Sequence, residues 1–257
     1  MSCDACRTLP PVIPQGYTTK GAYKEVAGLN TCKSHTDPQE KQALTFLRCY
    51  WPTGCVHGAC SPLRHLWHGH PDPAGGGPSS YKIEFLSPGA RFFEGNFAQA
   101  EWFPTDTEEK KNAIASFVSN EASIPRNVDT LLEITKRYNT LFPSVSKWAA
   151  LGLCWASGPG TPFVATGQVH PGRADKTDAE KLAIPHIVLA SKDEPAEEIQ
   201  GYTDVISTNG IGGHVETYST MWHGWMGARA NLDSEESNAE YRRGYTQVAD
   251  FFEKYLK

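Results

Sequence analysis

From Asp106 onward, hydrophobic and polar positions recur first at the spacing of helices and then at the spacing of strands. Asp106 or Thr107 is a suitable N-cap for a helix that runs to about Asn120, because a short polar side chain there accepts a hydrogen bond from a free backbone N–H. A second helix is predicted over Asn127–Leu141. Its apolar side comprises Val128, Leu131, Leu132, Ile134 and Leu141.

Apolar runs of strand length follow, each bounded by turn residues or by a further helix. The predicted strands are Lys147–Cys154, Phe163–Val169, Ile184–Ala190 and His214–Tyr218. The predicted helices are Glu197–Thr208 and Ser237–Leu256, and in the second of these Tyr241, Tyr245, Val248, Phe252 and Tyr255 share a face. Strands and helices in alternation form a mostly parallel sheet with helices on both faces. The pattern therefore predicts an α/β fold.

Three residues suited to catalysis lie where apolar runs give way to small or polar residues. They are Cys154 in GLCWA, Asp193 in LASKDEP and His223 in MWHGWMG. The carboxyl ends of parallel strands meet at one sheet edge, so we expect these side chains to share a site there. A thiol with its ordinary pKa of about 8.5 needs a histidine to take its proton and a carboxylate to orient that histidine. The order nucleophile, acid, histidine is that of α/β-hydrolases.

Each of these residues also has an ordinary structural explanation. A lone cysteine at a strand end is most often a small buried hydrophobe. Asp193 could serve only to form a turn, and His223 could be a half-buried surface residue. The joint spacing is the stronger observation, because a strand and a helix are predicted between Cys154 and Asp193, and a helix and a strand between Asp193 and His223. The turn after Cys154 keeps most of a G-x-C-x-G elbow, with Ala156 in its last position.

Long stretches of the chain also match a known family. The region from Val164 to Leu256 contains ATGQVHPG, IPHIVLASKDEP, GGHVETYSTMWHGWMGARAN and EYRRGYTQVADFFEKYL, and nearer the start come CDACRTLPPVIPQGYTTKG and FFEGNFAQAEWFPTDTEEKK. In these segments, about two thirds of the chain, the sequence resembles the fungal dienelactone hydrolase-like proteins of the α/β-hydrolase superfamily. The resemblance implies hydrolysis of small lactones or carboxylic esters without a metal or an organic cofactor.

The resemblance also implies roles for individual residues. Cys154 would be the nucleophile that forms an acyl-enzyme, Asp193 the orienting acid and His223 the general base. The backbone N–H of Trp155, directly after the nucleophile, would donate a hydrogen bond in the oxyanion hole. Arg229 is a candidate for binding a substrate carboxylate.

Other aromatic and histidine residues accompany the predicted site. Trp222 and Trp225 flank His223 and are candidates for the wall of an apolar substrate site, although such aromatics also belong to ordinary cores. His170 ends a strand at the same sheet edge as the predicted nucleophile and could line the site. His186 begins an apolar strand, where a hydrogen-bonded core histidine is the more common case.

Residues 31–88 depart from the family that the chain resembles, which would carry early strands and a helix in this region. The block is rich in Cys, His, Pro and Gly and has no clear hydrophobic period. We expect at most short helical stretches here, weak order, and early strands that are missing or irregular. The resemblance is also shortened after Cys154. A family member with impaired catalysis is therefore one alternative to an active enzyme.

Cysteines and histidines are concentrated between residues 49 and 70. They are Cys49, Cys55, His57, Cys60, His65, His68 and His70. Zinc prefers thiolate and imidazole ligands, so a zinc-binding module is a second alternative. The spacing matches no C-x2-C and H-x3-H pairing, which favours an irregular insertion over a metal site.

Composition narrows the partners and the location. A net charge of −5 and a pI near 6.0 argue against nucleic acid and anionic membranes, because both bind basic patches. Seven cysteines, an odd number, fit reduced thiols, and the opening residues lack the pattern of an export signal, so we expect a cytoplasmic location. With 257 residues, 39% of them hydrophobic, we expect one domain over 1–257. The expected partner is a small lactone or ester, and the oligomeric state stays open.

Overall fold

The computed structural model describes residues 22–26, 29–33, 42–48, 89–90, 99–102, 105–143, 145–153, 161–227 and 229–257. The strands are β1 (Ala22–Val26), β2 (Leu29–Lys33), β3 (Gln42–Arg48), β4 (Gly89–Ala90), β5 (Lys147–Leu153), β6 (Phe163–Val169), β7 (His186–Ser191) and β8 (Gly213–Tyr218). The helices are the 3₁₀ helix η1 (Ala100–Trp102), α3 (Glu108–Ser119), α4 (Ile124–Leu141), α5 (Lys176–Ala179), α6 (Ala196–Thr208) and α7 (Glu235–Leu256). None of these helices combines the length and the apolar character needed to cross a membrane.

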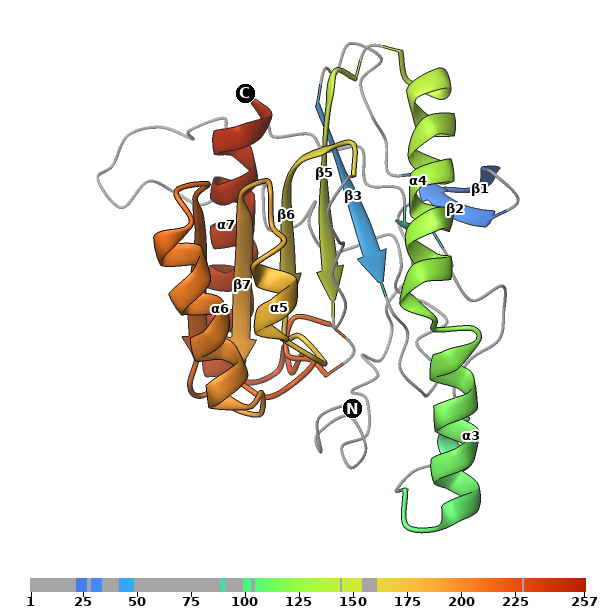
Figure 1. Cartoon of the computed structure of the whole chain (residues 1–257), viewed down its shortest axis with the longest axis vertical. Coiled ribbons are helices and arrows are strands. Elements are labelled where there is room, and N and C mark those ends of the chain that lie inside the picture. Colours follow the sequence, from blue (N-terminus) through green and yellow to red (C-terminus); the bar gives the residue numbers. More distant parts are fainter. Residues whose placement is uncertain are drawn as a thin grey trace.

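The strands form one eight-stranded sheet in the order β1-β2-β4-β3-β5-β6-β7-β8 (Figure 1). The pairs β1–β2 and β2–β4 are antiparallel, whereas all pairs from β4 to β8 are parallel. Parallel neighbours need a crossover connection, and α5 and α6 lie in the crossovers that follow β6 and β7. The predicted α/β class with a mostly parallel sheet is confirmed.

The strand β3 corrects the expectation for residues 31–88. It pairs in parallel with β5 along its whole length, from Gln42 opposite Lys147 to Arg48 opposite Leu153, and its other edge pairs with β4. Its sequence QALTFLR contains no Gly or Pro and includes threonine and phenylalanine, which favour strands. The prediction of at most short helical stretches is therefore wrong for β3, and this early strand is present. The rest of the block, apart from the end of β2, lies outside the described residues.

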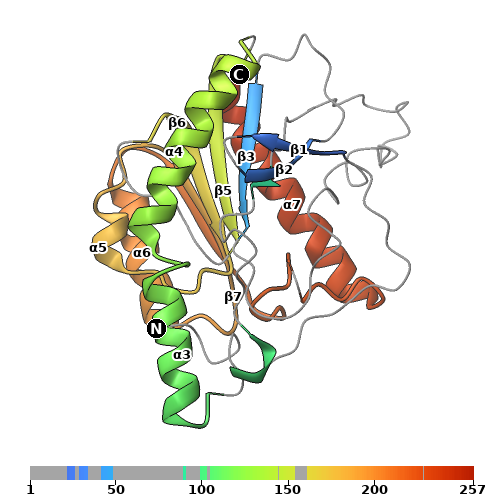
Figure 2. The ribbon, with the colours of Figure 1, turned by 90° about the vertical axis from the view of Figure 1, so that its right-hand side faces the viewer.

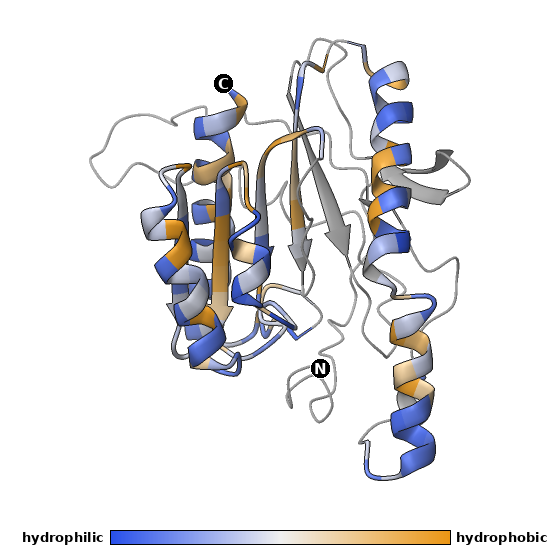
Figure 3. Ribbon diagram, in the orientation of Figure 1, coloured by the Kyte–Doolittle hydropathy of each residue, from blue (hydrophilic) through white to orange (hydrophobic). Residues whose placement is uncertain are grey.

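Helices cover both faces of the sheet. Figures 1 and 2 show α7 on one face and α4, α5 and α6 on the other. The strand β7 serves both layers, because Ile187 and Leu189 belong to the cluster with α7 whereas Val188 and Ala190 belong to the cluster with α5 and α6. Figure 3 shows β7 as hydrophobic along most of its length. A strand buried on both faces is expected to have this composition.

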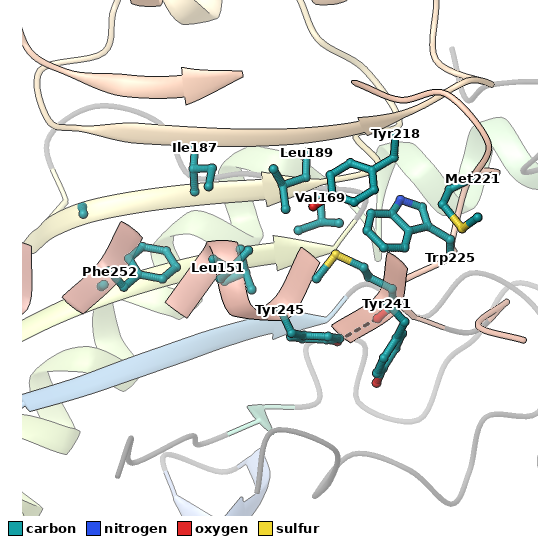
Figure 4. Close-up of a cluster of buried hydrophobic side chains, with 14 of the residues drawn as sticks. Leu151, Val169, Ile187, Leu189, Tyr218, Met221, Trp225, Tyr241, Tyr245 and Phe252 are labelled. Atoms are coloured by element: carbon teal, nitrogen blue, oxygen red, sulfur yellow. Dashed lines mark hydrogen bonds between the residues drawn. The ribbon is translucent and has the colours of Figure 1, made fainter. Parts of the chain in front are cut away.

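One hydrophobic cluster fills the space between the sheet and α7 (Figure 4). Leu151 of β5, Val169 of β6 and Phe252 of α7 are all 0% exposed within it. The predicted apolar face of α7 is confirmed, since Tyr241, Tyr245, Val248 and Phe252 are buried and Tyr255 is partly buried against the same cluster.

The segment after β8 is anchored in this cluster on both sides of residue 223. The rings of Tyr218 and Trp225 have centroids 4.4 Å apart. Met221 and Met226 are also buried there, and the hydroxyl of Tyr245 donates a hydrogen bond to the carbonyl of Met226 at 2.7 Å (Figure 4). Packing on both sides therefore fixes the position of the loop that carries residue 223.

On the opposite face, Trp148 of β5 packs against α4. Its ring stacks on Tyr138 with centroids 5.7 Å apart, and its indole N–H donates to Oδ1 of Asn139 at 2.6 Å. The prediction that Leu141 lies on the apolar side of this helix is wrong, because Leu141 is 49% exposed. Phe142, the C-cap residue, instead contacts Tyr138, with ring centroids 6.0 Å apart.

The predicted helix starts agree with the structure for α3, whereas α4 and α7 (Glu235–Leu256) begin earlier than predicted. The hydroxyl of Thr107 accepts a hydrogen bond from the backbone N–H of Lys110 at 3.3 Å, so the predicted cap of α3 is confirmed. Helix α4 begins at Ile124, three residues before the predicted start, because Pro125 is favourable in a first turn. The four-residue helix α5, capped by Asp175, is too short to give a periodic signal.

Candidate active site

The carboxyl ends of β5 to β8 lie side by side at one edge of the sheet. Leu153 of β5 pairs with Val169 of β6, and Val169 pairs with Leu189 of β7. Ser191, the last residue of β7, pairs with Tyr218, the last residue of β8. The segments that follow β6, β7 and β8 therefore begin next to one another, as the sequence pattern predicts for the site.

The turn after β7 buries the carboxylate of Glu194, whose side chain is 1% exposed. Its Oε2 accepts a hydrogen bond from the backbone N–H of Ser191, and its Oε1 accepts one from the Ser191 hydroxyl at 3.0 Å. The backbone N–H of Lys192 donates to the carbonyl of Met221 at 3.0 Å, which ties this turn to the segment after β8. A buried carboxylate is costly unless it is hydrogen-bonded, so these contacts hold Glu194 in one position.

The imidazole of His223 packs against this carboxylate. Its Nδ1 lies 2.7 Å from Oε1 of Glu194, and its side chain is 2% exposed. Such a distance is typical of a hydrogen bond to a charged group. With Glu194 ionised, the imidazole proton is on Nδ1 and the lone pair is on Nε2. Nε2 is then the nitrogen that can accept a proton from a nucleophile.

Separate contacts hold the backbone of His223. Its N–H donates to Oδ2 of Asp193 at 2.9 Å, and its carbonyl accepts a hydrogen bond from Nη1 of Arg229 at 3.2 Å. Gly224 follows with a φ of +91°, in the left-handed region that favours glycine. A Cβ there would lie 3.3 Å from three carbons of Arg229, so a larger residue would also crowd that side chain.

The two adjacent acids therefore occupy different places. The sequence pattern singles out Asp193 as the acid that orients His223, but the carboxylate in contact with the imidazole belongs to Glu194. Asp193 contacts the backbone of the same histidine. The only signal for Glu194 in the sequence is that SKDEP places two consecutive carboxylates after a strand.

His170 joins the site from the end of β6. Its ring meets that of His223 edge-on, with centroids 5.0 Å apart and planes inclined by 67°. Its φ of +41° is unusual for a residue with a side chain, and such strain is often found at functional sites. Burial and the nearby His223 and Arg229 lower the pKa of His170 well below its ordinary 6.5. His170 is therefore neutral at pH 7 and adds no charge beside His223.

The predicted substrate residues have different environments. Trp225 is fully buried beside Tyr218, which favours the core role over a substrate wall. Trp222 is partly buried, and its indole N–H donates to the carbonyl of Arg229 at 3.0 Å. Arg229 is 8% exposed and supports the backbone of His223. Roles of Trp222 and Arg229 toward a substrate stay predictions.

His186 is the core histidine that the sequence predicts. It is 1% exposed, and its Nδ1 lies 2.8 Å from the hydroxyl oxygen of Thr166. Burial lowers its pKa to about 4. It lies at the start of β7, away from the carboxyl ends of the strands, and takes no part in the site.

The predicted nucleophile Cys154 and the predicted oxyanion donor Trp155 lie outside the described residues, as does the Cys/His run of residues 49–70. Their roles stay predictions. The predicted strand ending at Cys154 is present as β5 up to Leu153. In the described part of the chain, no group of three or more His, Cys, Asp or Glu side chains is placed to hold a metal ion.

The mostly parallel sheet with helices on both faces has the architecture of the α/β-hydrolase fold. Solved structures share it. The acylaminoacyl peptidase of Pyrococcus horikoshii matches 95% of this chain with a TM-score of 0.60 and 9% identity, and this chain spans 43% of that peptidase chain. A protein of Klebsiella pneumoniae assigned as a dienelactone hydrolase matches 88% of this chain and 93% of its own, with a TM-score of 0.57 and 11% identity. At such identities the likeness concerns the fold alone.

Sequence comparison finds fungal relatives. No family model matches the chain. An uncharacterized AIM2 family protein of Schizosaccharomyces pombe is 29% identical over 173 residues, which cover 64% of this chain and 70% of that protein. A second AIM2 family protein of the same yeast is 29% identical over 171 residues, 63% of this chain and 69% of that protein. These relatives agree with the fungal character of the resemblance.

Proposed function

We propose that this protein hydrolyses small lactones or carboxylic esters through a thiol nucleophile, Cys154, and a general base, His223. The observation that carries the proposal is the buried imidazole of His223 at the carboxyl edge of the sheet, with its Nδ1 bonded to a carboxylate. A histidine whose Nδ1 is bonded to a carboxylate can transfer protons through Nε2. The fold supports the proposal, since proteins named as esterase, peptidase and dienelactone hydrolase share it.

The described neighbours of Cys154 support its role. Leu153 lies beside Val169 in the sheet, and the next residue after Val169 is His170, whose ring meets that of His223. Cys154 follows Leu153 directly in the sequence, at the end of the strand that pairs with the strand leading to His170. This connectivity is what supports Cys154 as the proposed nucleophile. The six other cysteines all precede β5 in the sequence.

The proposed reaction has two stages. The Cys154 thiol gives its proton to Nε2 of His223, the sulfur bonds to the ester or lactone carbonyl carbon, and the leaving oxygen takes the proton from Nε2 as the C–O bond breaks. A water molecule then loses a proton to Nε2 and attacks the thioester carbon, and the sulfur leaves with that proton. The backbone N–H of Trp155 would donate to the oxyanion in both stages.

The expected substrate is a small molecule, and Arg229 is the candidate that would bind a carboxylate on it. The guanidinium of Arg229 lies at the site, because its Nη1 donates a hydrogen bond to the carbonyl of His223, and a guanidinium suits a carboxylate in charge and geometry. The indole N–H of Trp222 donates a hydrogen bond to the backbone carbonyl of this arginine. These two residues are therefore our candidates for substrate selection, whereas Trp225 stabilises the loop from within the core.

The test compares wild-type protein with Cys154→Ala on an aryl acetate and an aromatic lactone. We expect the substitution to lower kcat/KM by at least about 10³-fold, because no acyl-enzyme can form without the thiol. Cys32→Ala in β2 is the matched control and should keep the wild-type rate. Mass spectrometry after a brief exposure to ester should locate the acyl group on Cys154. A wild-type protein without turnover, or a Cys154→Ala protein with full activity, would overturn the proposal.

A further inference from the structure

We propose that Glu194 is the residue that orients the imidazole of His223 and stabilises its charge, and that Asp193 positions the same histidine only through the backbone. The juxtaposition behind the proposal is direct: Oε1 of Glu194 lies 2.7 Å from Nδ1, whereas Oδ2 of Asp193 lies 2.9 Å from the backbone nitrogen. The catalytic consequence rests on the proposed function. The pairing itself can be measured in protein that has no substrate.

The two contacts respond differently when the imidazole is protonated. A backbone N–H has the same charge before and after proton transfer, so the bond to Asp193 is similar in both states. The bond between Glu194 and Nδ1 joins an anion to a neutral ring in the resting state and to an imidazolium after His223 has taken a proton. Only interactions that strengthen toward the transition state raise kcat. Glu194 therefore carries the charge-stabilising role, and Asp193 is a positioning residue.

The surroundings favour Glu194 for this role. Its side chain is 1% exposed and that of His223 is 2% exposed, so water screens their attraction little. Ser191 holds both oxygens of the carboxylate, through its backbone N–H and its hydroxyl. Asp193 is only partly buried. A carboxylate fixed by a second residue is the arrangement expected of a group that must keep an imidazole in one orientation.

The other titratable groups that face His223 in the described part of the chain do not compete for Nδ1. His170 meets the edge of the ring and is neutral at pH 7. Arg229 donates to the carbonyl of His223. Asp193 accepts from the backbone N–H. Removing the charge of Glu194 should therefore change the titration of His223 more than any other single change in these groups.

The experiment measures the His223 imidazole pKa by NMR, and kcat on an aryl ester, in four variants. Glu194→Gln keeps the size and an acceptor oxygen but removes the charge, and Asp193→Asn does the same at the neighbouring position. Glu194→Asp keeps the charge on a shorter side chain. Glu197→Gln is the control, because it removes an exposed carboxylate in the first turn of α6. A carboxylate stabilises the imidazolium and so raises its pKa.

We expect Glu194→Gln to lower the pKa of His223 and to lower kcat by about 10³-fold or more with little change in KM. Asp193→Asn still accepts the backbone N–H and should lower kcat by no more than about tenfold. Glu194→Asp should recover part of both losses, and Glu197→Gln should leave both unchanged. A purely structural role of Glu194 would lower the melting temperature without changing the His223 titration.

The proposal is overturned if Asp193→Asn lowers the pKa of His223, or kcat, as much as Glu194→Gln does. If the wild-type protein has no esterase activity, the proposed function fails, and the NMR titrations still decide the pairing. If Glu194→Gln does not fold, Asp193→Asn and Glu194→Asp decide it. The proposal is supported if His223 titrates as in the wild type in Asp193→Asn but differently in Glu194→Asp. The opposite result overturns it.

Discussion

Acid should destabilise this protein through His186, because its buried imidazole cannot take up a proton without cost. The ring is 1% exposed, and its Nδ1 lies 2.8 Å from Oγ1 of Thr166. No hydrogen-bond partner for Nε2 is found among the described residues. A protonated ring would carry a donor on both nitrogens and a positive charge in the core. Burial accordingly lowers the pKa of His186 from 6.5 to about 4.

The direction and the size of the pH effect on folding stability follow from this pKa. Below pH 6.5 the unfolded chain binds a proton at His186 that the folded chain does not bind, so folding stability is lost as the pH falls from 6.5 to about 4. Above pH 6.5 the residue is neutral in both states and stability does not depend on its titration. One pKa unit corresponds to about 1.36 kcal/mol, so the free energy of unfolding should fall by about 3 kcal/mol at pH 4 through this residue.

The test uses the double variant Thr166→Val, His186→Leu. It replaces both hydrogen-bonding partners by apolar side chains, so neither is left as a buried polar group without a partner. Urea unfolding at several values between pH 7 and pH 4 gives the free energy of unfolding. The wild-type protein should lose about 3 kcal/mol more than the double variant over this range, because all other groups titrate in both proteins. The single variant Thr166→Val keeps the histidine and should retain the acid loss. Parallel pH profiles for the wild type and the double variant would refute this account of His186.

Two further predictions concern packing and capping. Gly167→Ala should destabilise the protein by about 1–3 kcal/mol, because its Cβ would lie 2.6 Å from Cγ2 of Ile187 and 3.1 Å from Cδ1 of Leu151. Thermal unfolding checks this, and Gly201→Ala should destabilise less, because its closest contact is 3.2 Å, to Cβ of Lys176, and alanine favours the helix in which it lies. Thr107→Ala should cost about 1 kcal/mol and increase amide exchange in the first turn of α3, since the cap to the backbone N–H of Lys110 is lost. Thr107→Ser should keep the protection, and equal exchange in the alanine and serine variants would contradict the capping argument.

The sheet could be predicted where the chain repeats strand and helix at regular intervals. Phe163–Val169 is predicted with the bounds that the structure has, because the turn-forming sequence SGPGTP precedes it and Pro171-Gly172 follow it closely. The strand β3 could not be predicted in the same way. Its seven residues stand alone in a region without hydrophobic period, and a short apolar run does not say whether it is a strand or a helix. Its pairing with β5, more than a hundred positions later in the chain, decides the question.

The site shows the same division between what local sequence determines and what packing determines. That an acid and a histidine meet at the sheet edge follows from two parallel strands ending side by side, and it could be predicted from where apolar runs stop. The sequence could not predict which of the two consecutive acids meets the ring, because their positions in the chain differ by only one residue. The turn decides it: Ser191 binds both carboxylate oxygens of the residue three positions later and so draws Glu194 inward. Asp193, with a side chain one methylene shorter, is left with the nearer backbone N–H of His223. The hydrogen bonds of Ser191 thus decide which of the two acids meets the imidazole.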